Sequence, residues 1–145
     1  MYEEHKAMVR QFQETFHQPV NLDEKTFNAE RINLRRDLQK EEETELLDAL
    51  VDIAYIVLGT SVECKTYDEY ARAMYFIARD IAYKMFHSKK VFDIAFKRVQ
   101  EANMDKLENG NPLVNGVTTP LDESKPYGKV MKRKGWIAPD LSDLV

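Results

Sequence analysis

The sequence predicts an all-α protein: a helical bundle of four to five helices with an extended, irregular C-terminal tail. Helix-breaking residues are almost absent from the first hundred residues, where the only glycine before residue 110 is Gly59 and the only proline is Pro19. Apolar residues recur there at helical intervals, and no alternating pattern of any length suggests a strand. A chain of 145 residues is long enough to bury one core.

Two helices are predicted in the first part of the chain. The first covers about residues 3–17, because Met8, Val9, Phe12 and Phe16 fall on one helical face. The segment HQPVNLDEK reads as a loop, and a long second helix follows over about residues 27–58. Gly59 is the expected C-terminal cap of that second helix.

Two further helices complete the predicted bundle. One covers about residues 67–86 and begins after Thr66, and the next follows the joint HSKK. The apolar spacing that predicts the last helix is that of Phe92, Phe96, Val99 and Asn103. Glycine and proline then become frequent, so we divide the chain into a helical domain, 1–109, and an irregular tail, 110–145, that packs on this domain or on a neighbouring subunit.

Composition excludes several classes of protein. With 43% hydrophobic and 32% charged residues, the chain has the profile of a globular protein. The net charge of −4 gives no general attraction to nucleic acid or to an anionic membrane. Cys64 is the only cysteine, so no internal disulfide is possible, and no signal or membrane-spanning segment is evident. We therefore expect a cytoplasmic protein that binds neither nucleic acid nor membrane.

A row of acidic residues marks the long second helix. Glu41, Glu45, Asp48 and Asp52 are spaced i, i+4, i+7 and i+11, which places them on one face of a continuous helix, with Glu42 beside them. A solvated surface stripe explains Glu41 and Glu45 equally well.

Asp48 and Asp52 stand in a different setting, because the segment LLDALVDIAYIVL around them is otherwise apolar or Tyr. Such a helix is expected to be buried. Two buried carboxylates carry a large desolvation penalty and repel each other, and no basic residue of this segment can pair with them. A hard divalent cation, Mg²⁺ above all, is a better explanation than a structural role. Carboxylate-held Mg²⁺ and a spare carboxylate base favour hydrolysis of a phosphoanhydride.

The segment LRRDLQKEEETELLDALVDIAYIVLGT resembles the all-α nucleotide pyrophosphohydrolases, which include MazG, the phosphoribosyl-ATP pyrophosphatases and the dimeric dUTPases. Their shared signature is EExxE on one helix and ExxD on the next. The resemblance is greatest to short MazG-like proteins, many from phages. It extends to VQEANMDKL, GKVMK and WIAPDL and so covers most of the chain.

The resemblance implies an activity and a set of site residues. The activity is Mg²⁺-dependent hydrolysis of a nucleoside triphosphate to a nucleoside monophosphate and pyrophosphate, by a homodimer or homotetramer; Mn²⁺ is an alternative metal. The implied catalytic residues, which also bind metal, are Glu41, Glu42, Glu45 and Asp48. Asp52 is added to these metal ligands because of its apolar setting on the same helix face. The implied substrate-binding residues are Asn103 and Lys106, with Lys129 and Lys132 as weaker candidates for phosphate contact.

The sequence departs from the family pattern because its two acidic motifs overlap and share Glu45. No turn residue separates them, so one continuous helix is predicted where the family has two facing helices. A second departure is the additional helix at about residues 67–86. Ligands on one helix cannot surround an ion. The opposing ligands then come from another subunit's copy of this helix or from Asp80, or the site is incomplete and the protein only binds nucleotides.

Two other functions remain open. A non-catalytic, oligomeric nucleotide-binding or protein-interaction module is the main alternative, with Arg72, Arg79 and Lys84 available to pair with a partner's acids. A nucleic-acid role rests only on the small basic cluster KVMKRKG, which lacks interleaved aromatic residues.

Overall fold

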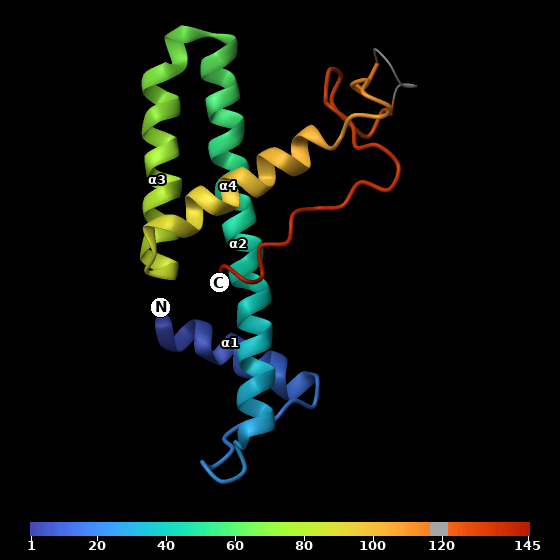
Figure 1. Ribbon diagram of the computed structural model, residues 1–145. Coiled ribbons are helices and arrows are strands. Elements are labelled where there is room, and N and C mark those ends of the chain that lie inside the picture. The colour runs from blue at the N-terminus through green and yellow to red at the C-terminus, as the bar shows by residue number, and fades with distance from the viewer. Residues whose placement is uncertain (117–121) are drawn as a thin grey trace. The chain divides into compact units, whose positions relative to one another are not determined.

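The computed structural model describes residues 1–116 and 122–145 (Figure 1). The described residues form helices and irregular segments with no β-strand, which confirms the predicted all-α class. The elements in chain order are α1 (Tyr2–Thr15), α2 (Ala29–Glu63), the short 3₁₀ helix η1 (Lys65–Tyr67), α3 (Asp68–Phe86) and α4 (Lys89–Met104).

The chain forms two compact units, Met1–Gln39 and Lys40–Val145. In the first unit, a loop joins α1 to the beginning of α2. The loop contains a turn in which Asp23 Oδ1 accepts hydrogen bonds from the backbone N–H and the hydroxyl of Thr26, both at 2.7 Å. Asn28 then caps α2, because its Oδ1 accepts a hydrogen bond of 3.1 Å from the backbone N–H of Arg31.

One apolar core holds the second unit together. Figure 1 shows α3 lying beside the last part of α2, with α4 crossing this pair. The α3 contribution consists of alanines, which allow the helices to approach closely. The buried residues of this core are Leu47, Leu50, Val51 and Ala54 of α2, Ala78 and Ala82 of α3, Val91, Phe92, Ala95 and Val99 of α4, and Leu141.

The long helix α2 confirms one prediction and corrects two. It is continuous through both acidic motifs, as expected from the absence of turn residues. Gly59, however, does not end it: the helix continues to Glu63, and the N–H of Cys64 still donates to the carbonyl of Thr60 at 2.9 Å. Nor is this helix buried all round, since Ile53 is 44% and Ile56 69% exposed.

The described part of the chain after residue 110 returns to the helices of the second unit. Trp136 Nε1 donates a 2.6 Å hydrogen bond to the carbonyl oxygen of Ala102 near the end of α4. Arg133 binds the carbonyl and the carboxylate of Asp105, both at 2.7 Å, and the Arg98 guanidinium pairs with Asp143. These contacts fix the irregular segment against α4. None of the described helices has the length and hydropathy needed to cross a bilayer.

Candidate functional site

The predicted acidic residues all lie on α2, but they differ in their position along the helix axis and in their burial. Glu41, Glu42, Glu45 and Asp52 are exposed, and only Asp48 is half-buried. The expected burial of both aspartates is therefore wrong for Asp52, which is exposed and lines a cavity. A helix rises 1.5 Å per residue, which separates Glu41 from Asp52 by about 16 Å along the axis. Among the described residues, no three His, Cys, Asp or Glu side chains converge as metal ligands would.

A cavity of about 680 Å³ lies at the Asp52 end of the acidic row. It is formed by α2, the end of α4 and the segment that follows residue 122. From the predicted site residues it brings together Asp52, Asn103, Lys106, Lys129 and Lys132. Its other lining residues are Tyr55, Ile56, Met104, Lys125, Val130 and Met131.

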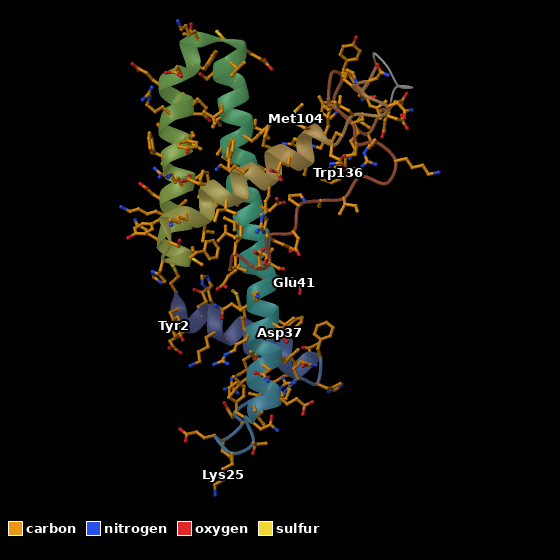
Figure 2. The ribbon with its side chains drawn as sticks, viewed as in Figure 1. Tyr2, Lys25, Asp37, Glu41, Met104 and Trp136 are labelled. Atoms are coloured by element: carbon orange, nitrogen blue, oxygen red, sulfur yellow. The ribbon has the colours of Figure 1, made fainter. Side chains whose placement is uncertain are left out.

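The basic side of this cavity is organised around α4 and Trp136. Figure 2 shows Met104 and Trp136 at this end of the second unit, and Glu41 further along α2. Lys106 Nζ donates a 2.6 Å hydrogen bond to Asn103 Oδ1, so the amide of Asn103 finds its partner inside the cavity. The ammonium groups of Lys106 and Lys132 lie 5.3 and 4.5 Å from the centre of the Trp136 ring. Cation–π attraction to one indole thus holds two lysines together.

Asn115 positions the segment that brings Lys125 and Lys129 to the cavity. Its side chain is fully buried. The Nδ2 amide donates to the carbonyl of Lys125 at 3.0 Å, and Oδ1 accepts from the N–H of Asp122 at 2.9 Å. The backbone N–H of Asn115 also donates to the carbonyl of Lys129 at 2.8 Å. One buried amide therefore replaces the regular secondary structure that this segment lacks.

In and beside the cavity, charges of the same sign disfavour one another's ionised forms. Burial lowers the pKa of Lys106, and the charges of Lys132 and Lys129 lower it further, while Asp52 acts in the opposite direction. Burial raises the pKa of Asp48, the charge of Asp52 raises it further, and Lys132 lowers it. Crowded cations stabilise a bound anion, and crowded carboxylates stabilise a bound cation.

The opposite side of the cavity is apolar. Tyr55 lines the cavity and is held by a 2.5 Å hydrogen bond from its hydroxyl to Gln100 Oε1 and by the Phe96 ring at 5.7 Å. Ile56 and Met104 complete this wall and are both largely exposed. The lining of the cavity therefore combines four lysines with aromatic and aliphatic side chains.

The carboxylates of α2 fit an Mg²⁺ site completed by water and substrate phosphates, and they do not fit a closed cage of protein ligands. Mg²⁺ is usually held by one or two protein carboxylates, while water and substrate phosphates complete its octahedral shell. Asp48 and Asp52 are one helical turn apart and close enough for the charge of one to affect the pKa of the other, so this pair fits such an ion. Within one chain, the residues that the structure describes do not fit a closed cage of three or more carboxylates.

Sequence reasoning missed several residues of this region. Lys125 and Tyr55 line the cavity without belonging to any motif, and Asn115 acts from an irregular segment where no periodicity points to a buried side chain. The Asn-Gly pair at residues 115 and 116 marks only a turn. Asp80, considered as an opposing ligand, is exposed and lies outside this cavity.

The basic residues considered for a partner surface on α3 are partly paired within the chain. Arg72 lies 3.7 Å from Asp68, and Arg79 lies 3.9 Å from Asp93. Both pairs are exposed, so their contribution to stability is small.

A comparison of the chain with protein-family models, with curated proteins and with solved structures found no match.

Proposed function

We propose that this protein is a cytoplasmic, Mg²⁺-dependent nucleoside triphosphate pyrophosphohydrolase. One observation supports this more than any other: Asp52 and Asn103 share a cavity with a cluster of lysines. The lysines are Lys106, Lys125, Lys129 and Lys132. A cation cluster on one side, a carboxylate pair at the edge and an apolar wall opposite match the three parts of a metal-bound nucleotide.

Each group has a role that follows from its surroundings. Lys129 and Lys132 bind the phosphates that leave as pyrophosphate, and Asn103 holds Lys106 directed into the cavity. The base packs on Tyr55. Asp48, whose pKa is raised by burial and by Asp52, is the carboxylate to which we give the role of proton acceptor.

The reaction is a displacement at the α-phosphorus. Water forms the new P–O bond, its proton passes to Asp48 while Asp52 would hold the metal, and the bond between the α-phosphorus and the bridging oxygen breaks as pyrophosphate leaves. When bound, Mg²⁺ neutralises phosphate charge and lowers the pKa of the attacking water. The protein's own contribution is the placement of the phosphates by lysine and of the proton acceptor by α2.

The remaining acids suggest how an oligomer completes the site. Glu41, Glu42 and Glu45 lie too far along α2 to join Asp52 around one ion. If two copies of α2 pack antiparallel about a two-fold axis near the middle of the row, Glu41 of one copy faces Asp52 of the other, and Glu45 faces Asp48. A homodimer, or a homotetramer built from it, therefore supplies the facing ligands that the family arranges within one chain.

The test is pyrophosphate release from a panel of canonical and modified nucleoside triphosphates, with and without Mg²⁺. We expect release that requires the metal. Asp48→Asn should lower kcat at least about 100-fold, the usual minimum contribution of a positioned general base. Asp37→Asn, the same change at an exposed acid of α2 outside the row, should leave kcat unchanged. Full activity in Asp48→Asn would disprove the role given to Asp48.

A non-catalytic nucleotide-binding module is the second candidate, favoured because no three carboxylates converge among residues 1–116 and 122–145. It predicts a rise in melting temperature with nucleotide but no pyrophosphate release from any triphosphate, whereas the hydrolase gives both. Substitution Lys132→Gln should weaken nucleotide binding by about 10-fold under either function, because a charge-assisted hydrogen bond contributes about 1.5–3 kcal/mol.

A further inference from the structure

A second cavity, of about 300 Å³, lies within the first unit and is unrelated to the site above. Every residue that lines it belongs to Met1–Gln39. It is formed by one face of α1, by the loop after α1 and by the first turns of α2. Its lining residues are Lys6, Val9, Arg10, Gln13, Pro19, Val20, Asn21, Leu22, Phe27, Arg31 and Arg35.

The lining of this cavity is strongly basic. It includes four cations and none of the acids of the first unit. Lys6 and Arg10 stand one turn apart on α1, and Arg31 and Arg35 stand one turn apart on α2. The chain as a whole has a net charge of −4, so this concentration of positive charge is local. Cations gathered around so small a space repel one another unless an anion lies between them.

Little within the chain neutralises these four cations. Arg10 donates to Asn21 Oδ1 at 2.8 Å and lies 3.6 Å from Glu14, at the exposed rim. Among the residues that the structure describes, no ion pair involves Lys6, Arg31 or Arg35. Three positive charges of the cavity thus remain available to a ligand.

We propose that this cavity binds a small phosphate ester. A phosphate dianion offers three terminal oxygens to donors that come from two helices, which suits this arrangement better than a planar carboxylate does. Val9, Leu22 and Phe27 provide an apolar wall for the organic part of the ester. The cavity is at the lower end of the size range of ligand sites, so the ligand is smaller than a nucleoside triphosphate.

The test is calorimetric titration of the full chain with inorganic phosphate, phenyl phosphate and benzoate. We expect phenyl phosphate to bind more tightly than inorganic phosphate, because of the apolar wall, and more tightly than benzoate. Arg35→Gln should weaken phenyl phosphate binding at least about 10-fold. Arg36→Gln, the same change at the next residue, which does not line the cavity, should leave the affinity within about two-fold of wild type.

Further variants test whether phenyl phosphate binds in this cavity and not in the first one. They also test whether a loss of binding is caused by loss of folding. Lys6→Gln lies on the other helix and should weaken binding as Arg35→Gln does, with helix content unchanged by circular dichroism. Lys132→Gln, in the nucleotide cavity, should have no effect on phenyl phosphate. Equal losses in Arg35→Gln and Arg36→Gln, loss in Lys132→Gln alone, benzoate binding as tight as phenyl phosphate, or no binding by the wild-type chain would each overturn the proposal.

Discussion

At the scale of single residues, Asp48 shows that a side chain placed for the proposed activity can lower the stability of the folded protein. The side chain is half-buried, and both burial and Asp52 raise its pKa. In the unfolded chain the same carboxyl group has an ordinary pKa. The folded protein therefore holds this proton more firmly than the unfolded chain does, and it becomes less stable when the pH rises far enough to remove it.

Asp48→Asn is expected to stabilise the protein while it removes activity. The stability linked to the proton on Asp48 is present at acid pH and is lost as the pH rises through the raised pKa, so the gain should be largest at neutral and alkaline pH. In a chain of this size, ~1 kcal/mol raises Tm by about 2–4 °C. Thermal melting across pH in the absence of metal measures the difference from wild type.

The matched variant for this measurement is Asp37→Asn, at an exposed position of the same helix, whose Tm difference from wild type should not depend on pH. If Asp48→Asn melts at a lower temperature than wild type at neutral pH, the prediction is wrong. The Asp48 carboxylate then has a stabilising partner in the folded protein.

Lys106 illustrates what residue-level reasoning from sequence can reach. The motif that contains Asn103 and Lys106 predicts two polar residues near a phosphate, and the structure places both in one cavity. Their hydrogen bond is local, but the Trp136 ring that contacts the ammonium groups of Lys106 and Lys132 lies about thirty residues further along the chain than Lys106. No local pattern encodes that contact.

At the scale of elements, periodicity predicted the helices well, and the end of α2, which it misplaced, has a physical cause. Glycine is frequent at helix ends. A helix ends at a glycine, however, only where that glycine adopts the left-handed conformation or where a helix-breaking residue follows. The residues from Thr60 to Glu63 contain no such breaker, and the backbone of Gly59 is not left-handed. The helix therefore continues for one more turn.

Gly59→Ala tests this boundary directly. A Cβ atom added at Gly59 meets no other atom within 4 Å. Within a helix, alanine is more stable than glycine by about 0.5–1 kcal/mol, which should raise Tm by a few degrees. Gly128→Ala is the contrasting variant, because Gly128 has φ +81° and alanine is strained there. A fall in Tm for Gly59→Ala would place the end of the helix at Gly59 after all.

At the scale of the whole molecule, the two basic cavities differ in how far sequence could predict them. The cavity lined by Asp52, Asn103 and Lys106 was anticipated in part, because the acidic and Asn/Lys motifs resemble those of a known family. The cavity of the first unit was not anticipated, because Arg31 and Arg35 read as ordinary surface charges of an amphipathic helix. Only the fold of α1 onto the start of α2 sets Lys6 and Arg10 opposite them.

The acidic row bears on the proposed dimer. Along one helix, Glu41 and Asp52 are about 16 Å apart, so the four acids of the row cannot all bind a single ion from one chain. An antiparallel pair of α2 helices from two copies brings Glu41 and Glu45 of one copy to Asp48 and Asp52 of the other. In such a dimer every site depends on both chains, and two different inactive variants can restore one intact site between them.

Mixing variants tests this dependence. Glu41→Gln/Glu45→Gln and Asp48→Asn should each be inactive alone, because each damages every site of its own homodimer. In a mixed dimer, the site formed by the glutamates of the Asp48→Asn chain and the aspartates of the other chain is intact. Since half of the dimers are mixed at equilibrium and each has one good site of two, pyrophosphate release should recover to about a quarter of the wild-type rate. No recovery, with mixed dimers verified by mass spectrometry, would assign all the working carboxylates to one chain.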